Sequence, residues 1–105
     1  MILIVALLLQ AGDFAASADK FTACLTGTVR MGMTMRMKPD DFETGFAKAC
    51  LDEQAAFRAA GIATAIAAGR TPEQAATEID GNIANGRRIY AADQRRFIET
   101  GVVPR

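Results

Sequence analysis

The chain has 105 residues, of which half are hydrophobic, with nine Gly and three Pro. This length and composition predict one folded domain with a single core and exclude a disordered tail. Twelve basic residues balance twelve acidic residues, so no overall charge draws the protein to nucleic acid or to an acidic membrane surface. We therefore expect no nucleic-acid partner, and any charged partner must be recognised locally.

The N-terminus is an apolar run over residues 1–9, and the small-residue sequence Ala16-Ser17-Ala18 follows it. This order is typical of a secretory signal peptide, so we predict removal of residues 1–18 and a single helical domain over residues 19–105. A membrane span needs about 20 apolar residues, so we expect no transmembrane span in the mature chain. The run lacks the usual basic start, which leaves an alternative in which residues 2–18 belong to the fold of a cytosolic protein.

Cys24 and Cys50 are the only two cysteines. In a small exported chain, this count predicts one disulfide and a periplasmic or secreted location. If the chain turns back near Lys38 between two helices, the two cysteines lie at similar heights, since each residue of a helix adds about 1.5 Å. The geometry therefore favours an inter-helix bridge, and the alternative is a pair of unlinked buried thiols.

Three stretches of helical periodicity predict an all-α fold, a small antiparallel three-helix bundle with up-down-up topology. The first predicted helix covers residues 19–37. Its predicted inward seam is Phe21, Cys24, Thr28, Met31 and Met35. The second predicted helix starts at Pro39 and runs without a break to residue 68, with a seam of Phe42, Phe46, Cys50, Phe57 and Ala60.

The third predicted helix has the clearest start, because Thr71 can cap it, Pro72 suits its first turn and Gln74 can reach back to the cap amide. It is expected to end near Thr100. Its predicted seam is Ala76, Ile79, Ile83, Gly86, Tyr90 and Phe97. Because glycine inside a helix costs about 1 kcal/mol relative to Ala, we expect Gly81 or Gly86 to mark a close helix crossing.

The residue types that are missing limit the chemistry. The chain contains no His, and its only Ser is Ser17 in the predicted signal peptide. A Ser-His triad, a Cys-His nucleophile and a His-based zinc site are therefore excluded. No glycine-rich phosphate loop is present. The sequence thus predicts a protein that is not an enzyme and needs no cofactor.

Four methionines stand at alternate positions: Met31, Met33, Met35 and Met37. Thioethers are soft ligands that suit Cu(I), so a Met-rich Cu(I)-binding protein is an alternative function. On a helix, however, Met31 and Met35 point away from Met33 and Met37. This geometry favours packing over metal binding.

Glu53 falls on the apolar seam of the second predicted helix and needs a partner there. The register predicts an ion pair with Arg87 or Arg88. A second alternative function is a carboxylate-based enzyme with a pocket that holds Glu53 and Tyr90.

Arginines recur along the third predicted helix, and Arg88, Arg95 and Arg96 form a candidate binding stripe for phosphate groups or an acidic protein. Solvated arginines that cover apolar surface are the simpler interpretation. Together, these features predict a small exported, non-enzymatic interaction module that binds an unidentified protein or envelope component.

Overall fold

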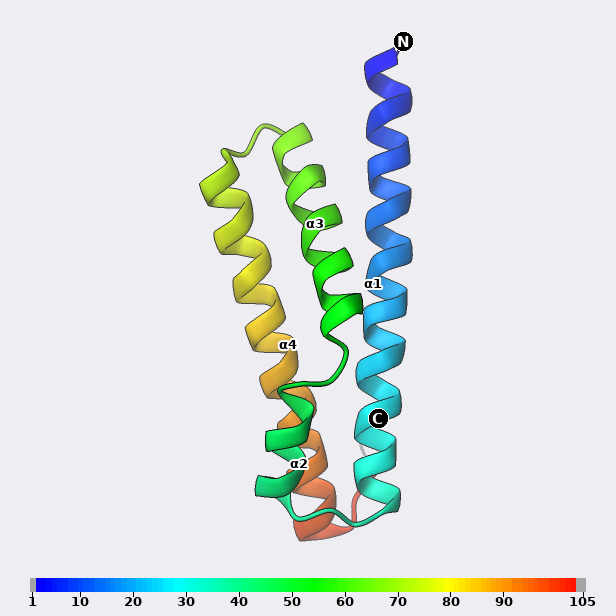
Figure 1. Ribbon diagram of the computed structural model, residues 1–105, viewed down its shortest axis with the longest axis vertical. Helices are drawn as coiled ribbons and strands as arrows, with labels where there is room; N and C mark the ends of the chain where they lie inside the picture. Colours follow the sequence, from blue (N-terminus) through cyan, green and yellow to red (C-terminus); the bar gives the residue numbers. More distant parts are fainter. Residues whose placement is uncertain (1, 104–105) are drawn as a thin grey trace.

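The computed structural model describes the backbone of residues 2–103 and the side chains of residues 13–103. This part of the chain folds into four α-helices: α1 (Ile2–Thr34), α2 (Pro39–Phe46), α3 (Leu51–Ala67) and α4 (Pro72–Thr100). The three long helices lie side by side and alternate in direction, and the short α2 packs against the C-terminal half of α4 (Figure 1). The all-helical class is confirmed, with four helices in place of the predicted three.

The predicted helix over residues 39–68 is broken between Phe46 and Leu51. Cys50 adopts a left-handed conformation, with φ of 62°, which ends the regular hydrogen-bond ladder before α3 begins. Residues 47–50 contain no Gly or Pro that would have indicated this break from the sequence. It is instead fixed by tertiary contacts, because Arg87 of α4 bonds two carbonyl groups of the turn and Cys50 is bonded to α1.

The predicted start of α4 is confirmed in detail. Thr71 accepts a hydrogen bond from the Gln74 amide at 3.1 Å, and the Gln74 side chain accepts one from the Thr71 amide at 3.0 Å. Pro72 is the first residue of the helix. This reciprocal cap satisfies backbone donors that a helix start would otherwise leave free. Gly101 ends the helix in the left-handed conformation, with φ of 74°.

The buried core shares Phe21 with the predicted seam of α1 and otherwise follows a neighbouring face of that helix. Its members are Phe21, Leu25, Val29 and Met33 of α1, Phe42 and Phe46 of α2, and Ala75, Ile79 and Ile83 of α4. Met31 and Met35, which were expected to point inward, are 62% and 67% exposed. Met31 and Met35 lie on the same face of α1 as Cys24 and Thr28 but nearer to its C-terminal end. Because α3 begins only after Cys50, which contacts α1 at Thr28, α3 does not cover this part of the face.

Close helix approaches occur at glycines other than the two that were predicted. A Cβ atom at Gly32 would lie 2.5 Å from the Phe42 ring, and one at Gly61 would lie 2.6 Å from Ile79 Cδ1. Nothing lies within 4 Å of such an atom at Gly81 or Gly86. The expectation of a crossing at either of these two residues is therefore wrong, since both face open space on α4.

Phe14, which lies inside the predicted signal segment, contributes to the packing of α1 on α3. Its ring centre is 5.2 Å from that of Phe57, which in turn lies 5.4 Å from Phe21.

Within the described residues, no helix combines the length and the apolarity that crossing a membrane requires.

Candidate functional site

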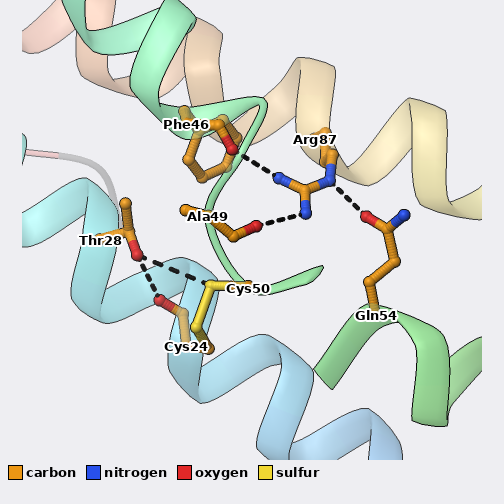
Figure 2. The surroundings of a disulfide bond; sticks show 7 residues. All are labelled: Cys24, Thr28, Phe46, Ala49, Cys50, Gln54 and Arg87. Carbon is orange, nitrogen blue, oxygen red and sulfur yellow. Dashed lines mark hydrogen bonds between the residues drawn. A yellow bond between two sulfur atoms is a disulfide. The ribbon is translucent and has the colours of Figure 1, made fainter. Parts of the chain in front are cut away.

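The disulfide between Cys24 and Cys50 joins the middle of α1 to the turn before α3, with a Cα–Cα distance of 6.0 Å. The pairing predicted from the sequence is confirmed. Closing a loop over a sequence separation of 26 residues stabilises the fold by about 3.5 kcal/mol in the loop-entropy account. Thr28 Oγ1 lies 3.7 Å from Cys50 Sγ and donates to the Cys24 carbonyl oxygen at 2.9 Å (Figure 2).

Arg87 of α4 holds the same turn from the other side (Figure 2). Its guanidinium donates to the carbonyl oxygens of Phe46 at 2.8 Å and Ala49 at 2.6 Å, and to Gln54 Oε1 at 2.6 Å. It also packs on the rings of Phe46 and Phe21, at 5.4 and 5.7 Å from their centres. Burial lowers the pKa of Arg87, because its partners are neutral acceptors. Arg87 thus supplies hydrogen bonds to two carbonyl groups of the α2–α3 connection.

Arg87 and Arg88, the predicted ion-pair partners of Glu53, form their hydrogen bonds with other residues. Arg87 is engaged with the turn, and Arg88 is exposed and donates to Asn85 Oδ1 at 2.5 Å. Among the described side chains, Glu53 makes no ion pair and no hydrogen bond. It is half-buried, and one of its carboxylate oxygens lies within 4.8 Å of both disulfide sulfurs.

The predicted arginine stripe is divided between structural and exposed residues. Arg95 donates to Glu43 at 3.0 Å and to Asp40 at 2.9 Å, which fastens α4 to α2. The hydrogen bond with Glu43, followed by that with Asp40, raises the pKa of Arg95. Arg88 and Arg96 are exposed. The three residues therefore do not form one uniform row of available guanidinium groups.

The four methionines are dispersed around α1 and its end. Met33 is buried and Met37 is half-buried, whereas Met31 and Met35 are exposed. Their thioethers therefore occupy different environments, as the helix geometry of the sequence suggested. Tyr90 and Glu53 are also separated: Tyr90 lines a groove beside α1, and Glu53 lies at the disulfide.

The groove that Tyr90 lines runs between α1 and α4 and has a volume of about 420 Å³. We call it the α1–α4 groove. Its lining residues are Thr26, Val29, Arg30, Met33, Ile89, Tyr90, Asp93 and Val103. A second hollow of about 350 Å³ shares Arg30, Met33 and Val103 with it and extends it to Phe97. The apolar floor therefore continues along both helices.

The polar groups of the α1–α4 groove have opposite charges. Arg30 is exposed on the α1 side and Asp93 is half-buried on the α4 side. Among the side chains of residues 13–103, neither takes part in an ion pair or a hydrogen bond. Thr26 Oγ1 and Tyr90 Oη lie 3.4 Å apart and share a hydrogen bond across the groove. Within the described part of the chain, the arrangement therefore offers an apolar surface with a cation and an anion that have no partner.

Sequence reasoning did not identify this groove. Tyr90 and Phe97 were assigned to the core seam of the third predicted helix, and Arg30 and Asp93 are isolated charges that form no local pattern. The available signal was Ile89, an apolar residue outside the predicted seam, which is 48% exposed at the groove.

Comparisons with protein-family models, with curated proteins and with solved structures find no match to this chain.

Proposed function

We propose that the protein is a small exported, non-enzymatic interaction module that binds a segment of a partner protein in the α1–α4 groove. The observation that carries this proposal is the charge of Arg30 and Asp93 on opposite sides of an apolar floor, neither of which is paired with a side chain of residues 13–103. A partner segment would bury an apolar side chain on Val29, Met33 and Ile89 and place an acidic and a basic group against the two charges. Such contacts give orientation as well as affinity.

The mixed charge of the groove favours a protein partner over a lipid surface. A site for anionic lipid gains about 1 kcal/mol for each basic residue near the membrane, and Asp93 opposes that attraction. The groove is also an unfavourable place for acid–base chemistry. Its Tyr90 hydroxyl shares a hydrogen bond with Thr26, and its lining residues include no His, Cys or Ser, the side chains most often used as base or nucleophile.

Export is the second part of the proposal. The apolar N-terminus and Ala16-Ser17-Ala18 support a signal peptide over residues 1–18. The disulfide supports a periplasmic or secreted location, because thiols stay reduced in most cytosols. The intact mass of the chain, expressed with its own N-terminus, tests this part. We expect a mass that begins at Asp19 and gains about two hydrogens on reduction, whereas a full-length mass with free thiols would contradict export.

Selection from a random peptide library tests the groove and does not require the natural partner. The oxidised protein should enrich peptides that combine an apolar residue with one acidic and one basic residue. Against Arg30→Glu, the acidic residue of the selected peptides should change to basic, and against Asp93→Lys their basic residue should change to acidic. The matched control is Arg88→Glu, which changes an exposed charge outside the groove and should leave the selection unchanged.

Two results would contradict a protein partner at this site. In the first, the library yields no peptide, or yields peptides that bind the Arg30→Glu and Asp93→Lys variants as well as they bind the original protein. In the second, the protein floats with vesicles of anionic lipid and selects no peptide, which would indicate an envelope lipid as the partner.

A further inference from the structure

Glu53 brings a third potential ligand to the two sulfurs. Cys50 occupies the cap position before α3, and Glu53 stands three residues later in the first turn, so their side chains lie on one side of the helix. Cys24 reaches them from α1. One ligand atom from each residue lies within 4.8 Å of the other two. Two elements of the fold therefore gather two sulfurs and one carboxylate oxygen.

The carboxylate of Glu53 has no other structural task among the described residues. A glutamate at this position of a helix often bonds the cap amide, but α3 has no side-chain cap. No described cation or donor engages it either. A half-buried carboxylate without a protein partner is an unfavourable arrangement unless something else binds it.

We propose that reduction of the Cys24–Cys50 disulfide converts this cluster into a site for a thiophilic divalent cation, with Zn²⁺ as the best fit. This inference is independent of the function proposed above. A dithiol reductant supplies two electrons and two protons to the disulfide and becomes oxidised to its own disulfide. Binding of Zn²⁺ then displaces one proton from each of the two thiols.

The donor set determines the choice of metal. Thiolates and a carboxylate suit Zn²⁺, with Zn–S distances near 2.3 Å and Zn–O distances near 2.0–2.2 Å, whereas Mg²⁺ and Ca²⁺ prefer oxygen ligands alone. In tetrahedral geometry, the two sulfurs must separate to about 3.7 Å, which side-chain rotation can provide once the S–S bond is broken. Three protein ligands leave the fourth position open to water or another ligand.

The charge next to the site matches a metal complex of this kind. Two thiolates, one carboxylate and Zn²⁺ have a net charge of −1. Arg87 donates to the carbonyl oxygen of Ala49, directly before Cys50, and is bonded only to neutral acceptors. Its positive charge therefore lies across the turn from the two sulfurs and attracts an anionic complex at this site.

Titration of the reduced protein with Zn²⁺ against a chromophoric chelator tests the site. We expect one Zn²⁺ for each chain, none in the oxidised protein and none in a Cys24→Ser/Cys50→Ser variant. Loss of an outer partner already costs about 10–100-fold in metal affinity, so loss of a direct ligand in Glu53→Gln should weaken binding at least about tenfold. Glu73→Gln is the matched control, because Glu73 lies in the first turn of α4.

Substitution of Co²⁺ supplies a readout of the ligands themselves. The reduced protein should show thiolate-to-cobalt charge-transfer absorption, and Glu53→Gln should shift the visible bands, since the ligand field changes. If reduction unfolds the chain, addition of Zn²⁺ should restore helical circular dichroism in the original protein more readily than in Glu53→Gln. Failure of the reduced protein to bind Zn²⁺, or equal affinity in Glu53→Gln, would overturn the proposal.

Discussion

Arg87 donates a hydrogen bond of 2.6 Å to the carbonyl oxygen of Ala49, the residue that directly precedes Cys50. The turn between α2 and α3 is therefore held on one side by a guanidinium from α4 and on the other by a disulfide from α1 (Figure 2). Both attachments come from other helices, so the conformation of residues 47–50 is not set by their own helix propensity. The position of α2 against α4 follows from these two attachments together with the bonds from Arg95 to Asp40 and Glu43.

Removal of the disulfide is expected to destabilise the fold strongly. In the Cys24→Ser/Cys50→Ser variant, the unfolded chain regains the freedom of the closed loop, which lowers the free energy of unfolding by about 3.5 kcal/mol. Urea denaturation followed by circular dichroism measures this difference. A loss below about 1 kcal/mol would mean that the reduced unfolded chain retains compact structure.

Arg87→Met should lower the free energy of unfolding by about 3 kcal/mol, because two carbonyl groups and Gln54 lose a charged donor while the apolar stem is kept. The matched variant is Arg88→Met on the next residue. Arg88 is exposed and bonds only Asn85, so its replacement should cost less than about 0.5 kcal/mol. Equal losses in the two variants, measured in urea, would show that the turn does not depend on Arg87.

Alanine substitutions at two glycines should have opposite effects on thermal stability. Gly61→Ala forces a methyl group to 2.6 Å from Ile79 Cδ1, and overpacking of this kind costs about 1–3 kcal/mol, which exceeds the gain of about 0.5–1 kcal/mol from the better helix propensity of Ala. Gly81→Ala meets nothing within 4 Å and should stabilise α4 by about 0.5–1 kcal/mol. Calorimetry of both variants checks the pair, and a gain at Gly61 would contradict the close approach of α3 and α4.

The ion pair of Arg58 and Asp80 predicts a weak acid dependence of stability. The hydrogen bond from Arg58 is the main reason that the pKa of Asp80 lies below its usual value. The contribution is therefore present above the unfolded-state pKa of Asp and is lost as the pH falls through the folded-state pKa. The stability difference between the original protein and Asp80→Asn should be small at pH 7, because both side chains are exposed.

Unfolding of these two proteins at a series of pH values from 7 to 3 measures the effect. We expect the advantage of the original protein to shrink as the solution becomes more acidic. An advantage that grows with acidity would mean that Asp80 binds its proton more tightly in the folded protein, contrary to the direction given by Arg58.

Features that depend on neighbouring residues were predictable from the sequence. The cap formed by Thr71 and Gln74, the first turn at Pro72 and the end at Gly101 rely on interactions within a few residues. The pairing of Cys24 with Cys50 followed from their being the only two cysteines, although Cys50 lies in the break before α3 and not inside a helix. Local rules therefore account for the ends of α4, and the cysteine count accounts for the bridge.

Features that depend on contacts between distant residues were not predictable. The break before Leu51 results from a guanidinium that is distant in sequence, and the buried face of α1 results from where α3 begins. The predicted bond of Glu53 to Arg87 or Arg88 followed from the helix register, but carbonyl groups freed by the break attract Arg87 more directly. The α1–α4 groove is likewise a gap between two helices, and no local pattern marks it.

Binding of a partner segment in the α1–α4 groove is best measured by chemical-shift mapping of the ¹⁵N-labelled oxidised protein with a peptide selected from the library. We predict saturable shifts at Thr26, Arg30, Tyr90 and Asp93, with little change at Arg88 or along the exposed face of α3. Their loss in Arg30→Glu would support the α1–α4 groove as the partner site. Saturable shifts on another face, with none in the groove, would contradict the proposed function.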